Sequence, residues 1–162
     1  MQISSQLGIG GVLTAVHRRG GQELRRSQQR NTVTDQGLNL LLDSLFNGVP
    51  AGTWYLGLRG NGAQRPEDTM QDHAWSEFAG YPGERPEWVY GPARGGQLTS
   101  SVTLEYPITA DEAIIRGAFL TDRAEKGDNS GRLFMVAGWP AALILYPGDV
   151  LELSYALTLG RA

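Results

Sequence analysis

The sequence predicts an all-β protein: an antiparallel β-sandwich, most specifically a jelly roll, with one short α-helix and an extended N-terminal arm. The chain of 162 residues has 22 glycines and only 19% charged residues, below the roughly 25% of an average globular chain. Only one segment has a helical hydrophobic pattern, whereas several have the period of a strand. In the clearest of these, over residues 151–159, alternation places five apolar side chains on one face: Leu151, Leu153, Tyr155, Leu157 and Leu159.

The N-terminal part of the sequence predicts a hairpin. The apolar run at residues 12–16 leads into a glycine-containing turn at residues 18–21. Residues 22–33 are mostly polar and suit a strand at an edge or against a partner. A hairpin with so few core residues is suited to reach a neighbouring subunit. We therefore expect residues 1–33 to form an arm or hairpin and residues 34–162 to form the sandwich domain.

Residues 34–46 carry the one strong helical pattern. Thr34 can act as the N-cap, and Asp35 in the first turn suits the positive end of the helix dipole. Asn47-Gly48 is a typical helix end. The pattern predicts that one face is buried against a sheet edge or the open end of the sandwich. That face consists of Leu38, Leu41, Leu42 and Leu45.

Four further strands are expected along the rest of the chain. Gly117 lies inside one of them and indicates a bulge or a close approach of the backbone. Trp139-Pro140 is expected to end another, because proline cannot donate a ladder hydrogen bond. The strands are expected at residues 53–59, 97–108, 113–121 and 132–137.

The stretch from residue 60 to residue 96 follows no period and is far longer than an ordinary loop. Its aromatic residues argue that it is packed. They could line a groove for sugars or peptides, form a small core under the loop, or contact another subunit, and the small core is the favoured interpretation. Four of them are the candidates for partner contact: Trp75, Phe78, Tyr81 and Trp88.

Charge is distributed unevenly. Residues 1–30 contain five arginines and one glutamate, a net +4, which leaves −7 for the remainder of a chain whose total is −3. Such a group could contact nucleic-acid phosphates or the acidic surface of a protein. The arginines are not interleaved with aromatic residues, and the net charge of the whole chain is not basic. A protein partner is therefore favoured, and direct nucleic-acid binding is not expected. The candidate partner-binding arginines are Arg18, Arg19, Arg25, Arg26 and Arg30.

No set of residues forms a recognisable reaction centre. The chain has no cysteine, which excludes thiolate chemistry. A hydrolase built around His73 is disfavoured because its neighbouring serine and carboxylates crowd one segment, residues 72–77, whereas triads are assembled from separate elements. Acidic groups at residues 67–72 and 122–129 do not follow a calcium-binding pattern. We expect no enzymatic activity, no cofactor and no metal. No apolar run approaches the ~20 residues of a membrane helix, so no membrane contact is expected.

Several stretches carry a resemblance when they are taken together and in order. The most specific are N-x-V-T-x-x-G-L-N at residues 31–39 and W-Y-L-G-L at residues 54–58. Residues 75–81, residues 117–121 and the Pro-Gly-Asp turn at residues 147–149 follow in the same order. The sequence thereby resembles small virion structural proteins of tailed bacteriophages. This group includes capsid decoration (cement) proteins with jelly-roll folds, often trimeric, and also head-fibre, tail and adaptor proteins.

The resemblance implies a virion structural protein, assembled in the host bacterial cytoplasm. The first expectation is a homotrimeric decoration protein that contacts the major capsid protein or other virion proteins and stabilises the head shell. A tail or fibre-attachment protein is the alternative within this class. A carbohydrate-binding module at the particle surface, using the aromatics of residues 75–90, is the alternative of another class.

Overall fold

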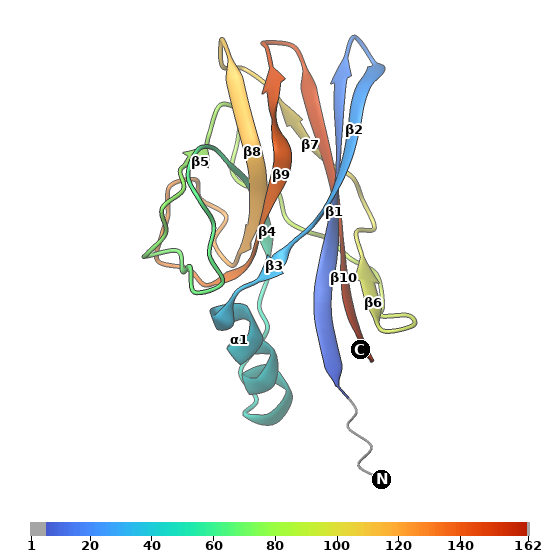
Figure 1. Ribbon diagram of the computed structural model, residues 1–162, viewed down its shortest axis with the longest axis vertical. Helices are drawn as coiled ribbons and strands as arrows, with labels where there is room; N and C mark the ends of the chain where they lie inside the picture. The colour runs from blue at the N-terminus through green and yellow to red at the C-terminus, as the bar shows by residue number, and fades with distance from the viewer. Residues whose placement is uncertain (1–5, 162) are drawn as a thin grey trace.

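The chain folds into two antiparallel β-sheets that face each other, with one helix below them (Figure 1). The computed structural model describes residues 6–161. The predicted sandwich is confirmed, and the jelly-roll topology stays a prediction. The terminal sheet, which holds the first and last strands, runs in the order β2 (Gln22–Arg30), β1 (Leu7–Arg19), β10 (Val150–Arg161), with β6 (Gln97–Thr99) and β7 (Leu104–Pro107) both paired to β10. The central sheet runs in the order β3 (Thr32–Val33), β9 (Leu133–Leu145), β8 (Ala113–Thr121), β4 (Tyr55–Arg59), β5 (Glu77–Phe78).

The core lies between the two sheets. The predicted alternation of the last strand is confirmed as far as Tyr155, because Leu153 and Tyr155 are buried while their neighbours in β10 are not. Leu159, which was expected on the same buried face, is 41% exposed. Ile115 and Met135 are buried from the opposite sheet. A hydrogen bond also ties the sheets, since the buried Tyr106 hydroxyl on β7 donates to the backbone carbonyl of β4 at 2.7 Å.

The N-terminal hairpin is present, but it is part of the sandwich. Strand β1 pairs with β2 on one side and with β10 on the other, in a register that runs from Leu7 opposite Arg161 to Arg18 opposite Val150. Leu13 on β1 is fully buried. The expected hairpin is confirmed, but the expectation of an arm separate from the sandwich is corrected for residues 7–30: alternate residues of β1 face the core, and β1 supplies an inner strand of the terminal sheet. Residues 1–5 of the expected arm lie outside the described residues.

Strand β9 continues through Trp139-Pro140, where an end was expected. Its pairing with β8 moves from Gly138 opposite Gly117 to Leu143 opposite Ile115, so β9 has extra residues at this point. Pro140 falls within the bulge, where no ladder hydrogen bond from its nitrogen is needed. The bulge expected at Gly117 is confirmed at the same place.

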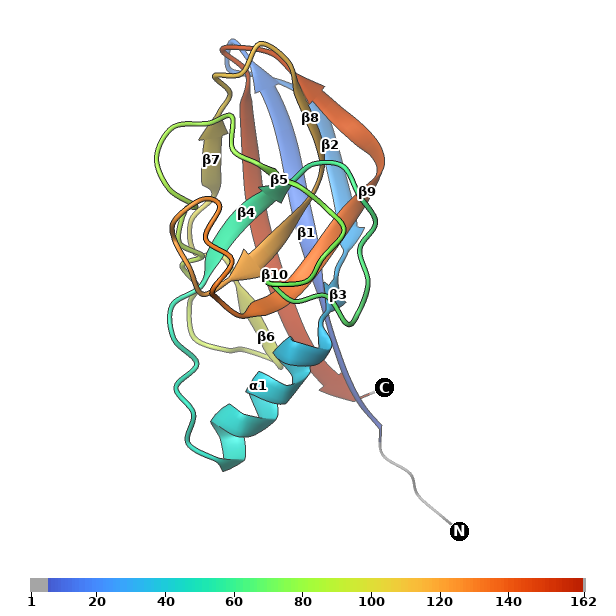
Figure 2. The ribbon, with the colours of Figure 1, turned by 90° about the vertical axis from the view of Figure 1, so that its left-hand side faces the viewer.

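Helix α1 (Asp35–Phe46) follows β3 directly and projects beyond the lower end of the central sheet (Figure 2). The irregular stretch after β4 contains only the short β5 before β6 begins. Within residues 6–161 no helix has the length and hydropathy needed to cross a membrane.

Candidate interaction surface

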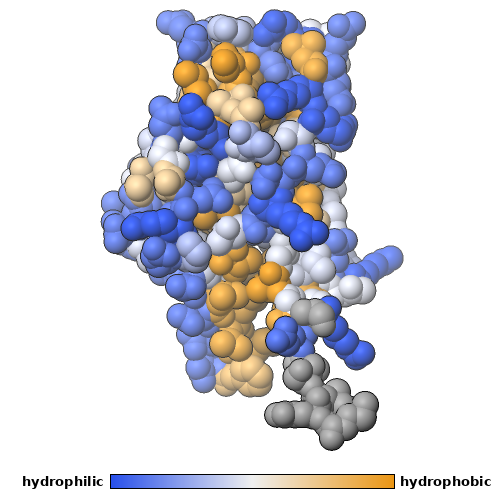
Figure 3. Space-filling model, viewed as in Figure 1, coloured by the Kyte–Doolittle hydropathy of each residue, from blue (hydrophilic) through white to orange (hydrophobic). Residues whose placement is uncertain are grey.

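Helix α1 presents an apolar face to solvent at the lower end of the molecule (Figure 3). Leu42 is 56% exposed, Leu45 69% and Phe46 79%, and Leu38 adds a smaller area. Single exposed leucines are ordinary on protein surfaces, but a contiguous group of this size marks an interaction site. We call Leu38, Leu42, Leu45 and Phe46 the α1 face.

Contacts at the start of the helix hold the α1 face outward. The Thr34 hydroxyl accepts a hydrogen bond from the Gly37 amide at 3.0 Å and donates to a backbone carbonyl of β9. Gly37 lies so close to the carbonyl of Phe134 that a Cβ would not fit there. Leu40 is buried on the same side of the helix. The helix therefore approaches β9 through its smallest residue.

This arrangement corrects the expected orientation of the helix. The predicted helix and its N-cap are confirmed, but of the four leucines expected to be buried only Leu41 packs against the core. The helical spacing located an apolar face correctly and assigned it to the wrong environment. Two residues of the sequence could have indicated the true orientation. Gly37 in the first turn marks the side on which the helix approaches β9 most closely, and Phe46 extends the apolar face beyond the core.

An apolar hollow of about 110 Å³ separates α1 from the terminal sheet. Residues of both sheets and of the helix line it, including Leu41, Trp54, Tyr90, Leu98 and Leu157.

Strand β1 has a free edge at the lower end of the molecule (Figure 1). After Arg30 the chain leaves the terminal sheet for β3, and the last contact on that side is the Asn31 amide donating to the Gly11 carbonyl at 3.1 Å. Because backbone groups alternate along a strand, those of Ile9 and Leu7 point to the same side as Gly11. No strand within residues 6–161 pairs with them there, and a groove runs along the stretch.

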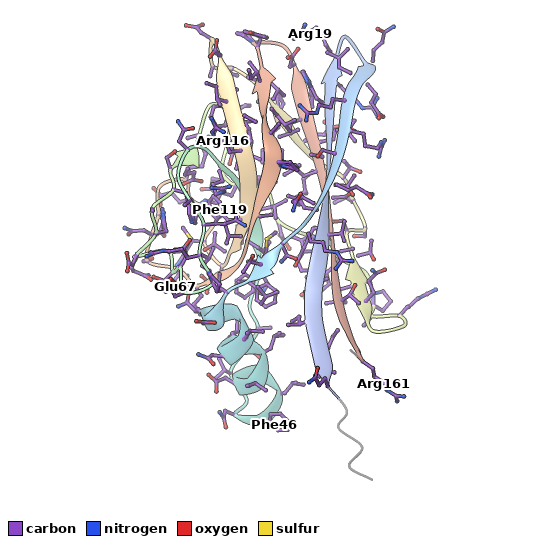
Figure 4. The ribbon with its side chains drawn as sticks, viewed as in Figure 1. Arg19, Phe46, Glu67, Arg116, Phe119 and Arg161 are labelled. Carbon is purple, nitrogen blue, oxygen red and sulfur yellow. The ribbon has the colours of Figure 1, made fainter. Side chains whose placement is uncertain are left out.

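Three of the five candidate arginines are already bound within the chain. Arg18 donates to Glu152 at 2.7 Å, and Arg26 forms two hydrogen bonds to Glu23 at 3.0 and 2.9 Å. Arg19, at the upper end in Figure 4, forms two hydrogen bonds to Asp149 at 2.7 and 2.9 Å.

The Arg19 pair has an electrostatic consequence. Hydrogen bonds from Arg19, from the backbone of Tyr146 and from His17 hold the pKa of the buried Asp149 carboxyl well below its usual range, against the opposing effect of burial. The group therefore fixes the turn before β10 to the end of β1. Arg25 and Arg30 are exposed and make no ion pair with the described part of the chain, so they stay candidates for contact with a partner.

The candidate aromatics are mostly inside the protein. Trp75, Tyr81 and Trp88 are only 3–4% exposed, and Phe78 is half-buried against the core. The indole nitrogen of Trp75 donates to Asp68 at 3.0 Å. Only Trp75 belongs to a small separate core, whereas Tyr81 and Trp88 lie in the main core and Phe78 packs against it. Their burial corrects the expectation that these aromatics form a partner-binding surface, because their area anchors the long irregular stretch to the sandwich.

The residues considered for catalysis point to different partners. The His73 ring stacks on Trp75 at 3.7 Å between centroids. Glu77 binds the fully buried Arg85 through two hydrogen bonds of 2.8 Å. The Ser76 hydroxyl contacts a backbone carbonyl at 3.4 Å and no imidazole. The geometry of a hydrolytic triad is not formed by these residues.

The acidic groups considered for cation binding are paired with arginines. Asp68 accepts hydrogen bonds from the Arg65 side chain at 3.0 Å and from its amide at 2.9 Å. Asp122 accepts from Arg132 at 2.7 Å. Among residues 6–161 no cluster of three or more metal-ligating side chains is assembled.

The chain was also compared with known proteins. No protein-family model matches it, and no curated protein matches its sequence.

Proposed function

We propose that the chain is a structural protein of a tailed-phage virion that binds the outside of the head shell as a decoration protein. The observation that carries this proposal is the α1 face, a contiguous apolar surface on a rigid sandwich. The resemblance of residues 31–39 and 54–58 to virion structural proteins supplies the setting. The partners would be the major capsid protein and further copies of the chain.

The mechanism is mechanical. A protein that binds the assembled shell but not its separate subunits stabilises the shell by mass action. At a free concentration of 100 times the dissociation constant, each bound copy adds about 2.7 kcal/mol. The α1 face suits this role because burying one large apolar side chain against a partner contributes about 1.5–3 kcal/mol of binding free energy. A few such side chains are enough to hold the protein on a surface that it contacts weakly otherwise.

The test uses purified particles of the phage or prophage that encodes the chain. Quantitative mass spectrometry is expected to find the chain in a copy number comparable to that of the major capsid protein. Particles assembled without it are expected to bind added wild-type protein but not the double variant Leu45→Ser/Phe46→Ser. The control is Leu24→Ser, which removes a leucine that is 50% exposed on β2, far from α1. Absence of the chain from the particles would refute the proposal.

The same surface would serve a tail or fibre-attachment protein. The copy number separates the two places, since a tail component is expected in a few copies for each particle. The carbohydrate-binding alternative loses its main observation, because Trp75 and Trp88 are buried.

A further inference from the structure

The free edge of β1 lies at the same end of the molecule as helix α1 (Figure 1), and apolar surface is exposed at that end (Figure 3). An extended segment placed against this edge would occupy the position beside β1 that becomes vacant where the chain leaves β2 for β3. Its backbone would pair with Ile9 and Leu7, and its inward side chains would lie beside α1. Strand addition of this kind uses main-chain hydrogen bonds for affinity and alternate side chains for specificity.

Strand β1 itself has the properties that such a segment needs. Leu7 is 72% exposed and Ile9 is half-buried, both on the inward side, while Gly8 and Gly10 carry no side chain on the outward side. Two copies of the edge can therefore approach each other without a clash between outward side chains. Neither Leu7 nor Ile9 is charged, so the edge lacks the inward charge by which many proteins block pairing of this type.

We propose that two copies of the chain pair through β1, antiparallel and about a twofold axis at Gly8, so that Leu7 of each copy lies opposite Ile9 of the other. This register alone pairs both free residues of both copies within residues 7–10. Each of the two residues then donates and accepts a backbone hydrogen bond across the axis. The two terminal sheets become one continuous sheet, and the α1 face of each copy lies against the other copy.

The available area fits a second copy. Six large side chains at this end are 37–79% exposed and together expose roughly 3.5 whole side chains, or about 500–700 Å² at 150–200 Å² each. A stable interface needs about 800 Å² from each partner, and the strand edge supplies the remainder. The six residues are Leu7, Leu38, Leu42, Leu45, Phe46 and Leu159.

The pairing rests on the proposed function and makes a second copy, rather than the shell itself, the direct partner of the α1 face. The double variant Leu45→Ser/Phe46→Ser would then lose particle binding because the dimer that joins neighbouring shell subunits is lost. The pairing is tested on the purified full chain, so its outcome is independent of incorporation into particles. Sedimentation equilibrium is expected to show a dimer. A monomer would overturn the pairing, and so would the trimer that the resemblance implies.

Two substitutions test the surface. Leu7→Lys places an inward charge on the free edge and is expected to give a monomer, with no cost to folding because the side chain is exposed. Leu24→Lys is the matched control, since Leu24 is 50% exposed on the free edge of β2, and it is expected to remain a dimer. Circular dichroism confirms that both variants are folded. A Leu7→Lys variant that stays dimeric overturns the proposal.

Cysteine cross-linking tests the register, because the chain has no cysteine of its own. The two Gly8 positions form a non-hydrogen-bonded pair with Cα atoms about 4.5 Å apart, within the range of a disulfide. Gly8→Cys is therefore expected to cross-link on mild oxidation. Gly10→Cys is the control on the same face, where a Cβ meets nothing within 4 Å. Its two copies lie about 13 Å out of register along the strands and are expected not to cross-link. The opposite pattern, or no cross-link from either variant, overturns the register.

Discussion

Replacing Gly37 by alanine tests how α1 is held against β9. Alanine in place of glycine inside a helix stabilises by about 1 kcal/mol through helix propensity. At this position the added Cβ would meet the backbone carbonyl of Phe134, which belongs to a paired strand and has no flexible end that can move aside. Overpacking costs about 1–3 kcal/mol, and a rigid neighbour places the cost near the upper value. The net expectation is a loss of about 2 kcal/mol.

Thermal unfolding followed by circular dichroism measures this loss. For a chain of this size, a change of 1 kcal/mol shifts Tm by about 2–4 °C, so Gly37→Ala is expected to lower Tm by about 4–8 °C. Asn39→Ala is the matched control in the same helix. Asn39 is exposed, and its replacement is expected to raise Tm slightly through propensity alone. A rise in Tm for Gly37→Ala would refute the close approach of the helix to β9.

Three further predictions concern buried polar groups. Glu77→Gln leaves the fully buried Arg85 without its carboxylate and is expected to cost about 3–5 kcal/mol, measured by urea unfolding, whereas no loss would contradict the ion pair. The hydrogen bonds from Arg19 lower the pKa of Asp149, so the stability that the carboxylate adds is present above the ordinary carboxyl pKa and is lost as pH falls below about 4. Urea unfolding at each pH is therefore expected to show a smaller loss of stability between pH 5 and pH 2 for Asp149→Asn than for the wild type. Burial raises the pKa of Tyr106 well above its usual range, so the neutral phenol stabilises the fold until pH rises past about 10. In an absorbance titration this phenol is expected to ionise only as the protein unfolds. Ionisation of Tyr106 in the folded protein would contradict its burial.

Local patterns were sufficient to predict most of the elements. The alternation of β10, the cap at Thr34 and the bulge at Gly117 depend on neighbouring residues in the chain, and all three were predicted correctly. The end expected at Pro140 was wrong because proline is excluded only where its nitrogen must join a ladder. That condition depends on the register between β8 and β9, which periodicity does not contain.

The candidate surface was harder to predict, because exposure is decided by contacts between distant segments. Arg18, Arg19 and Arg26 were expected to meet a partner, yet the carboxylates that they bind lie in the same hairpin and near the start of β10. Trp75 and Trp88 were named for partner contact and are anchors of a loop. The α1 face was mispredicted in the opposite direction. Its leucines were expected to be buried in the core, but they are exposed because the helix contacts β9 through Gly37 instead.

The pairing of β1 with β10 joins segments from nearly opposite ends of the described chain, and this affects how the protein is made. At about 5–20 residues per second, roughly 8–30 s of translation separate the synthesis of β1 from that of its partner. During that interval the edge of β1 that pairs with β10 has no partner strand, so the sandwich cannot close. Folding of the sandwich is therefore expected only after β10 has been synthesised, and it is slowed by the high contact order of this pairing. Removal of β10 would leave no folded remainder.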